Sequence, residues 1–208
     1  MSRKLLIGTR NAGKRREIAE ILCELTDTEV VFPDDIGVAP SPAEESLESA
    51  DSYGENARHK AEYFARVSGL PTAADDSGLE VFALGGAPGV RSRRFALPAA
   101  DQDAANNAEL LRRLSGAPAP KRRARYRCVV VFVERPGGAP HTFEGICGGS
   151  ILDVPKGKGG FGYDPLFLSD DIGRSFGEAE AAEKHQVSHR GRAFRAFAQW
   201  YVANPSPS

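Results

Sequence analysis

Short apolar runs alternate with amphipathic stretches along this chain, and this alternation limits the folds that it can adopt. A strand is predicted at residues 3–8, a helix at 12–25 and a second strand at 29–32. No internal repeat, low-complexity tract or long linker interrupts the pattern. We therefore predict one α/β domain over residues 1–203, with residues 204–208 as a frayed tail.

Later segments extend the same alternation. A helix is predicted to begin at Ser52, whose spacing to Glu55 fits a capping box, and to end before Gly69. The Pro-, Ser- and acid-rich residues 33–51 are predicted to form a loop before it. The remaining expected elements are two short strands around 75–78, a helix around 110–114, an antiparallel pair at 125–134 and 142–152, and a last helix beginning near Ser188.

Composition excludes several classes of protein. The 208 residues carry 27 Lys and Arg against 28 Asp and Glu, and a net charge of −1 argues against stable nucleic-acid binding. The longest apolar run, Cys128–Val133, is too short to span a bilayer, and the first residues lack the apolar length of a signal peptide, so we expect a cytoplasmic protein. Three widely spaced cysteines favour neither a disulfide framework nor a zinc site and are expected in the core.

A candidate phosphate-binding loop follows the first strand. Gly8–Lys14 fits the spacing G-x-x-x-x-G-K between a strand and a helix. The next residue is Arg15 rather than the Ser or Thr that binds magnesium in such loops, so carboxylates from elsewhere must hold any magnesium. Lys14, Arg15 and Arg16 also place three cations where the helix dipole prefers acids, which a bound anion would offset. The alternative is simply an exposed basic helix end.

Two further segments are candidate anion contacts. Ser188 is followed at once by His189 and Arg190 in the first turn of the last helix, which suggests a second basic helix end for the same polyanion. A solvated surface pair is the alternative interpretation. Lys60 lies one turn beyond Asn56 on the same helix face, and either reaches a phosphate or is solvated.

Carboxylates cluster at Asp75-Asp76-Ser77-Gly78, at the end of a short apolar strand where α/β proteins often place their sites. Because strand side chains alternate, the two aspartates are expected to face different ways, one holding a metal or orienting water and the other structural. A hairpin turn held by the aspartates is the alternative. In the preceding acidic loop, either one of Glu44, Glu45 and Glu48 completes a magnesium site or, as the alternative, all three are simply solvated.

The segment Gly159–Pro165 has more glycine than a turn requires. Its glycines expose backbone N–H groups, Phe161 offers a stacking face, and Asp164 can accept from a base or sugar. A tight loop with Phe161 in the core is the alternative. Residues 121–127 are strongly basic but lead directly into an apolar strand, and we interpret them as solubilising a sheet edge rather than as a nucleic-acid patch.

Taken together, these segments resemble one family in their order and spacing. The matching motifs are Thr9-x-Asn11-x-x-Lys14, Glu55-Asn56-Ala57-x-x-Lys60-Ala61, Ala74–Leu79, Gly85–Gly89, Gly159–Pro165 and Ser188–Gly191. The family is that of the inosine/xanthosine triphosphate pyrophosphatases, the Ham1-like non-canonical purine NTP pyrophosphatases, and the match covers about residues 4–200. It implies a homodimer of α/β subunits, each with an elongated mixed sheet flanked by helices and two lobes around an active-site cleft.

The resemblance also implies an activity and a set of site residues. Members hydrolyse ITP, dITP and XTP to the monophosphate and pyrophosphate with Mg²⁺, which keeps deaminated purines out of DNA and RNA. Asp76 matches the catalytic general base and metal ligand, and Glu48 the second metal-binding carboxylate. The residues matching the triphosphate contacts are Thr9, Asn11, Gly13 and the catalytic lysines Lys14 and Lys60. The residues matching nucleotide and base contacts are Ser77, Phe161, Gly162, Tyr163, Asp164, Lys184, His189 and Arg190.

This chain departs from the family pattern in two places. Where relatives often have an acidic residue followed by glycine and an aromatic before the helix, this chain has Glu48-Ser49-Ala50-Asp51-Ser52-Tyr53, so Glu44 and Glu45 stay alternatives to Glu48. After Gly89 the usual aromatic is replaced by the basic segment Arg91–Arg94, which would alter the cleft rim or the dimer contact. Two other functions stay open: a broader, Maf-like nucleotide pyrophosphatase, and a non-hydrolytic nucleotide sensor, against which a pair of metal-binding carboxylates argues.

Overall fold

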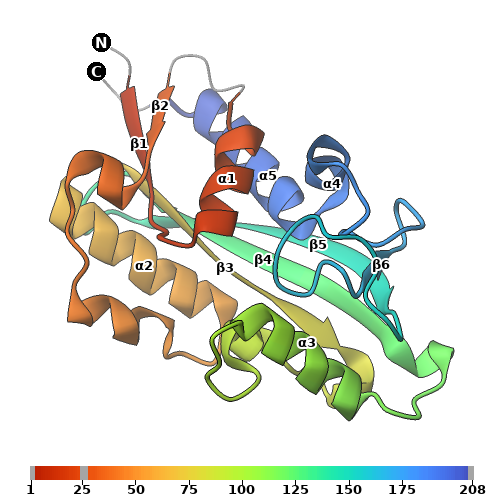
Figure 1. Ribbon diagram of the computed structural model, residues 1–208. Helices are drawn as coiled ribbons and strands as arrows, with labels where there is room; N and C mark the ends of the chain where they lie inside the picture. Colours follow the sequence, from red (N-terminus) through yellow and green to blue (C-terminus); the bar gives the residue numbers. More distant parts are fainter. Residues whose placement is uncertain (1–2, 24–27, 206–208) are drawn as a thin grey trace. The chain divides into compact units, whose positions relative to one another are not determined.

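A computed structural model describes residues 3–23 and 28–205, and its six strands form one mixed sheet. The strand order is β2-β1-β3-β4-β5-β6; β1 pairs in parallel with β2 and β3, whereas β5 and β6 pair antiparallel (Figure 1). The strands are β1 (Arg3–Ile7), β2 (Thr28–Val31), β3 (Thr72–Val81), β4 (Arg123–Val133), β5 (Pro140–Ile151) and β6 (Phe167–Ser169). The predicted α/β class with a mixed sheet is confirmed.

Helices flank this sheet, as the alternating pattern predicts. They are α1 (Ala12–Ile21), α2 (Tyr53–Ser68), α3 (Gln102–Arg113), α4 (Ala181–Val187) and α5 (His189–Ala203). Two short 3₁₀ helices, η1 (Pro33–Ile36) and η2 (Pro42–Glu48), lie where the sequence predicts a loop. Within the described residues, no helix combines the length and the apolar character needed to cross a membrane.

The helix ends follow from local sequence. Asn11 caps α1, its Oδ1 accepting from the backbone N–H of Lys14 at 2.9 Å, and Ser52 caps α2 by accepting from the N–H of Glu55. Gly69 ends α2 with φ of 71°, a conformation that side chains other than glycine rarely adopt. Residues 24 and 25 of the predicted first helix lie outside the described residues, as do 206–208 of the predicted tail.

The chain divides into two compact units, which we describe separately. The first unit comprises residues 1–76, 128–145 and 191–208, and the second comprises residues 77–127 and 146–190. The boundary therefore falls within β3, directly after Asp76, and also within β4, β5 and α5.

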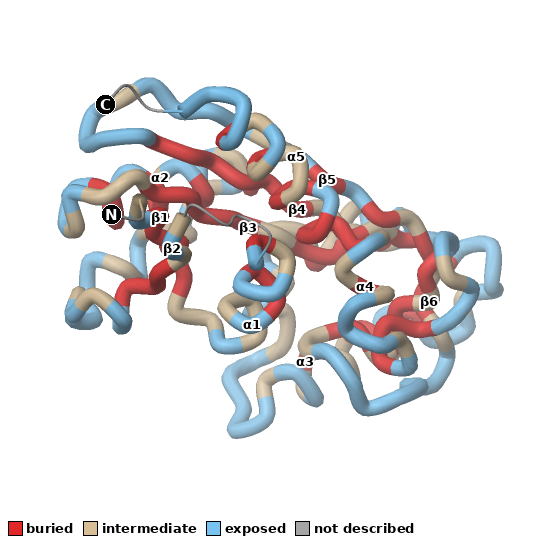
Figure 2. Tube along the Cα trace, turned by 90° about the horizontal axis from the view of Figure 1, so that it is seen from above, coloured by how far each residue is buried: buried red, intermediate tan, exposed pale blue. Residues whose placement is uncertain are grey.

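In the first unit, the sheet lies between two helical layers. Leu5 and Ile7 of β1 pack with residues of α1 and α5, whereas Leu6 faces the other side and packs with Phe64 of α2. The buried stretches of β3 and β4 appear red in Figure 2. These two packed faces fix the end of β1, where the candidate phosphate loop begins.

The second unit has its own core. Leu79 of β3, Leu110 of α3 and Tyr126 of β4 pack there with Phe167 of β6 and with Phe176. Cys147 belongs to this core and Cys128 to that of the first unit, as expected, but Cys23 is exposed, so its predicted core position is wrong.

Two sequence interpretations of strands are also wrong. The segment Asp75–Gly78 is not a turn between two short strands but the middle of one continuous strand, β3. β4 lies between β3 and β5 rather than at a sheet edge, so its basic residues do not protect an edge. Basic residues of the segment 121–127 have protein partners instead. The guanidinium of the buried Arg122, just before β4, donates to the carbonyl oxygen of Ile151 at 2.7 Å, and Arg125 of β4 pairs with Glu80 at 2.6 Å.

Candidate functional site

The loop between β1 and α1 presents a lysine to a buried aspartate. Lys14 opens α1 and its Nζ lies 2.9 Å from Oδ2 of Asp75, which has no exposed surface. The hydroxyl of Thr9 accepts from the backbone N–H of Asn11 at 3.3 Å, which shapes the loop before the helix. The predicted phosphate contacts Thr9, Asn11 and Lys14 thus gather around one helix N-terminus, together with Gly13 in its first turn.

The basic first turn of α1 has carboxylate partners within the protein. Arg15 donates to Asp34 at 2.6 Å and to Asp35 at 3.0 Å, both in η1, and its guanidinium lies 4.7 Å from the centre of the Phe32 ring. This cation is therefore already neutralised, whereas Arg16 is exposed. Lys14 is the cation of this turn whose ammonium group lies beside Asp75 of β3.

Asp75 and Asp76 make their contacts with different residues, as strand alternation predicts. Asp75 holds Lys14 and also accepts from the Sγ of Cys128 at 3.7 Å. Asp76 accepts at Oδ2 from the side-chain amide of Asn56 at 2.9 Å, and its Oδ1 lies 3.8 Å from Nζ of Lys60. Lys60 is therefore not a solvated surface lysine but a buried member of the site.

Two carboxylates share the ammonium group of Lys60. Its Nζ donates to Oε1 of Glu48 at 2.5 Å in addition to facing Asp76. Burial lowers the pKa of Lys60, but the charges of Glu48, Asp76 and Asp75 outweigh it and raise the pKa above its usual value. Burial also raises the pKa of the Asp76 carboxyl, and the positive charges of Lys60 and Lys14 only partly oppose this effect.

The carboxylates of Glu48 and Asp76 suit a magnesium ion. Both face one ammonium group, so their oxygens converge on a common point, and Mg²⁺ is usually held by one or two carboxylates together with substrate phosphates. Among the described residues, no cluster of three or more His, Cys, Asp or Glu side chains could hold a metal ion. Of the three candidate glutamates, Glu44 pairs with Arg10, Glu45 is exposed and Glu48 pairs with Lys60.

In the second unit, Asp164 organises the glycine-rich loop. Its Oδ2 accepts from the backbone N–H of Phe161 at 2.8 Å and from Nζ of Lys184 at 2.5 Å, and its Oδ1 lies 3.5 Å from the hydroxyl of Tyr126. Gly160 has φ of 70°, and a Cβ at this position would come within 2.0 Å of the same Oδ2. The loop therefore needs glycine here so that the carboxylate can close it.

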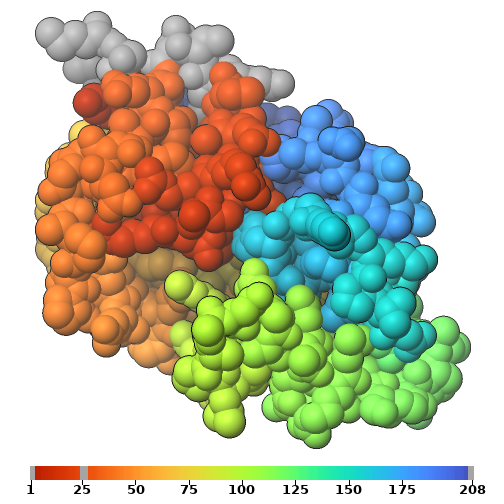
Figure 3. All heavy atoms as spheres, in the orientation of Figure 1, coloured from red at the N-terminus to blue at the C-terminus, as the bar shows by residue number. Residues whose placement is uncertain are grey.

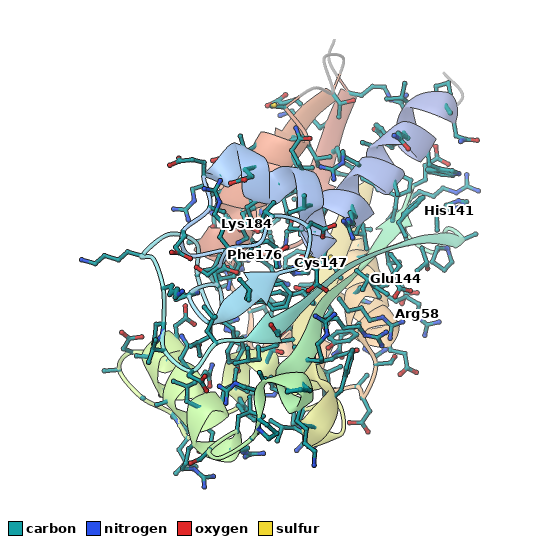
Figure 4. The ribbon with its side chains drawn as sticks, turned by 90° about the vertical axis from the view of Figure 1, so that its right-hand side faces the viewer. Arg58, His141, Glu144, Cys147, Phe176 and Lys184 are labelled. Atoms are coloured by element: carbon teal, nitrogen blue, oxygen red, sulfur yellow. The ribbon has the colours of Figure 1, made fainter. Side chains whose placement is uncertain are left out.

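The partly exposed Phe161 ring lies among cations. Nζ of Lys184 lies 5.2 Å and the guanidinium carbon of Arg190 5.5 Å from the ring centre, and Arg190 also donates to the hydroxyl of Ser77 at 2.8 Å. Figure 4 labels Lys184 beside Phe176, whose ring centre is 5.5 Å from Nζ. The alternative of a core Phe161 is thus not what the structure shows.

Three further members of the predicted base-binding set are buried. His189 stacks on Tyr126 with ring centres 4.5 Å apart, and both His189 and Arg190 are buried, so the solvated interpretation of this pair is wrong. Tyr163 lies in the core of the second unit and donates from its hydroxyl to the carbonyl oxygen of Ser92 at 2.8 Å. Burial raises the pKa of Tyr163.

Sequence reasoning missed the residues that hold these segments in place. Asn107 of α3 donates to the carbonyl oxygen of Gly162 at 2.9 Å, and Asp103 accepts from the N–H of Gly162 at 2.7 Å. In Figure 3 the cyan atoms of the loop lie against the green atoms of this region. Asp103, Asn107 and Arg10 carry no motif of their own, although Arg10 stands inside the matched segment Thr9–Lys14.

Comparisons with known proteins agree with the geometry. Residues 5–200 match the model of the Ham1 family. A protein of Syntrophobacter fumaroxidans named dITP/XTP pyrophosphatase is 50% identical over 91% of this chain and 78% of its own length, and one of Thermus thermophilus with the same name is 42% identical over 98% and 94%. The structure of a HAM1 protein from Coxiella burnetii superposes with a TM-score of 0.84 at 33% identity, covering 97% of this chain and 99% of that one.

Proposed function

Because this chain belongs to the Ham1 family, we propose that it hydrolyses the non-canonical purine nucleoside triphosphates ITP, dITP and XTP to the monophosphate and pyrophosphate. The observation that carries the proposal is the group around Lys60, in which one buried ammonium is shared by Glu48 and Asp76. A site that only binds a polyanion gains nothing from carboxylates beside its lysine, since they repel the ligand. A site that cleaves a phosphoanhydride needs them as metal ligands and as a base.

Magnesium is part of this proposal. Glu48 and Asp76 are the residues that would hold it, since both present carboxylate oxygens toward the same point. When bound, the ion neutralises charge on the phosphate oxygens and makes water more acidic.

In the proposed reaction, Asp76 acts as the general base. It accepts a proton from water while the water oxygen bonds to the α-phosphorus and the bond from that phosphorus to the α,β-bridging oxygen breaks. The pyrophosphate leaves with the electron pair of the broken bond. Lys14, Lys60 and the N–H groups at the start of α1 stabilise the charge that develops on it.

We assign base selection to the second unit. Phe161 offers a stacking face, and Arg190, whose guanidinium carbon lies 5.5 Å from the ring centre, offers donors. The O6 atom of hypoxanthine or xanthine accepts such a donor, whereas adenine presents an amino group there and leaves it unmatched. An unmatched buried donor costs about 1–3 kcal/mol, and several together discriminate more strongly.

The proposal extends to the setting in which the enzyme works. We expect a homodimer, as the resemblance implies, and we expect the protein to act in the cytoplasm, where precursors of DNA and RNA are consumed. Removing deaminated purine triphosphates there keeps them out of both nucleic acids.

A nucleotide panel tests the proposal. The protein is incubated with ITP, XTP, ATP, GTP and TTP, with and without Mg²⁺, and monophosphate and pyrophosphate are measured directly. We expect magnesium-dependent release of pyrophosphate from ITP and XTP, with ATP and GTP largely spared. Equal cleavage of TTP would favour a broader pyrophosphatase, release of orthophosphate would contradict the position of cleavage, and binding without hydrolysis would indicate a sensor.

A further inference from the structure

Arg10 connects three segments of the first unit through one guanidinium group. Its Nε and Nη2 donate to the two carboxylate oxygens of Glu44 at 2.7 and 2.9 Å, which is a bidentate ion pair. Nη2 also donates to the carbonyl oxygen of Val38 at 2.9 Å, and Nη1 pairs with Asp34 of η1. The side chain of Arg10 is 21% exposed and that of Glu44 18% exposed, so this pair is largely shielded from water.

Both ends of the Arg10–Glu44 pair adjoin the proposed reaction centre. Arg10 stands between Thr9 and Asn11, two of the proposed triphosphate contacts. Glu44 lies in η2, where it also accepts from the backbone N–H of Ser41 at 3.2 Å and so stabilises the start of the same helix. The last residue of η2 is Glu48, the partner of Lys60.

Arg10 also lies close to α2. The guanidinium carbon lies 5.9 Å from the centre of the Phe64 ring, and Phe64 is one helical turn beyond Lys60. A Cβ on Gly8 would lie 2.8 Å from the Phe64 side chain, so the phosphate loop already approaches α2 as closely as packing allows. The phosphate loop, η2 and α2 therefore meet around one side chain.

We propose that Arg10 is a positioning residue that fixes η2 against the phosphate loop and thereby holds Glu48 where it can take a divalent cation together with Asp76. This inference rests on the proposed function, which supplies the cation and the reaction. Arg10 acts through Glu44 and does not touch the substrate. Lysine cannot replace it, because a single ammonium cannot reproduce the bidentate pair together with the bond to Val38.

Two measurements test this role. Hydrogen exchange of peptides covering residues 41–50 is compared between the wild type, Arg10→Gln, Arg10→Lys and Glu44→Gln, with neither nucleotide nor metal present. The Mg²⁺ concentration that gives half-maximal turnover of ITP is then measured for the same proteins. Arg135→Gln is the matched control, since Arg135 is an exposed arginine of the first unit outside the proposed site.

We expect the Arg10 and Glu44 variants to exchange faster over residues 41–50 and to need about tenfold more Mg²⁺, the size of a typical coupling between contacting charged groups. Turnover at saturating Mg²⁺ should fall much less. The double variant Arg10→Gln/Glu44→Gln should need no more Mg²⁺ than either single variant. Arg135→Gln should match the wild type.

Two results would overturn the inference. A higher KM for ITP in Arg10→Gln but not in Glu44→Gln would make Arg10 a substrate contact. Unchanged hydrogen exchange over residues 41–50 would show that Arg10 does not hold η2 against the phosphate loop. An inactive wild type would instead count against the proposed function, and the exchange measurement would still decide the role of Arg10.

Discussion

Each unit contains one buried lysine held by a buried aspartate, but the two pairs are built differently. In the first unit, Lys60 lies 3.8 Å from Asp76 and 2.5 Å from Glu48, whose side chain is 31% exposed. In the second unit, Lys184 lies 2.5 Å from Asp164, and both side chains are at most 5% exposed. Asp164 is further fixed by the N–H of Phe161.

The difference indicates that the Lys60 group and the Lys184 pair have different roles. A partly exposed carboxylate such as Glu48 can leave its lysine and return to water or to a metal at little cost, so the Lys60 group is suited to exchanging partners. The partners of a fully buried ion pair cannot separate at little cost, because each would then be a buried charge without a counterion. We therefore interpret the Lys60 group as the part that takes part in the reaction and the Lys184–Asp164 pair as a structural ion pair that stabilises the glycine-rich loop.

The strongest test of this contrast is Asp76→Asn. The amide is similar in size and its oxygen can still accept from Asn56, so the fold should be kept. The variant cannot take a proton from water and is a poorer metal ligand, so turnover of ITP should fall about 10³-fold or more. Steady-state kinetics with pyrophosphate detection would measure the loss.

The control for this substitution is Asp51→Asn, in the exposed residues just before α2. It removes the same charge from the same unit and should leave turnover and stability unchanged. Near-normal turnover in Asp76→Asn would remove Asp76 from its proposed role and, with it, the assignment of the reacting part to the Lys60 group.

A second test compares Lys184→Met with Lys60→Met. In Lys184→Met the carboxylate of Asp164 stays buried without its cation, and the free energy of unfolding should fall by about 3 kcal/mol. In Lys60→Met the partly exposed Glu48 can turn to water and Lys14 still offsets the charge of Asp76, so the loss should be about 1 kcal/mol while turnover collapses. Urea unfolding followed by fluorescence would give both values.

Equal losses of stability in the two variants would break the comparison, since both lysines would then be structural. Lys121→Met is the control for replacing a lysine by methionine, because Lys121 is exposed in the second unit. It should leave the unfolding curve within the error of the wild type.

The sequence predicted the parts of this molecule that depend on local chemistry. The cap at Ser52, the stop at Gly69 and the different contacts of Asp75 and Asp76 follow from short-range rules and are confirmed. The continuous strand through Asp75–Gly78 was missed because Asp and Gly are uncommon in strands, whereas here β3 runs unbroken from Thr72 to Val81 beside β4.

Contacts between distant segments were beyond sequence reasoning. The burial of His189 and Arg190 depends on Tyr126 and Ser77, which are more than sixty residues away in the chain. The pairing of Arg10 with Glu44 likewise depends on where η2 packs, and neither residue shows a pattern that would announce it.

The smallest expected effect comes from a pair that is neither reacting nor buried. Arg123 donates from two nitrogens to the two oxygens of Asp170 in the second unit, each at 2.7 Å, yet both side chains are nearly half exposed. The hydrogen bonds from Arg123 lower the pKa of Asp170 below its usual value. After allowance for solvent screening, we expect Arg123→Gln to lower the free energy of unfolding by about 0.5 kcal/mol at pH 7.

The pH dependence of this small loss distinguishes it from a packing defect. Because the pKa of Asp170 is lower in the folded than in the unfolded protein, its stabilisation is complete above the unfolded pKa of about 4 and disappears as the pH falls through the folded value. The unfolding curves of the wild type and Arg123→Gln should therefore converge as the pH falls below about 4, and Asp170→Asn should behave in the same way. A loss that exceeded that of Lys184→Met, or that stayed constant with pH, would mean that exposure does not rank these pairs, and the contrast between the Lys60 group and the Lys184 pair would lose its physical basis.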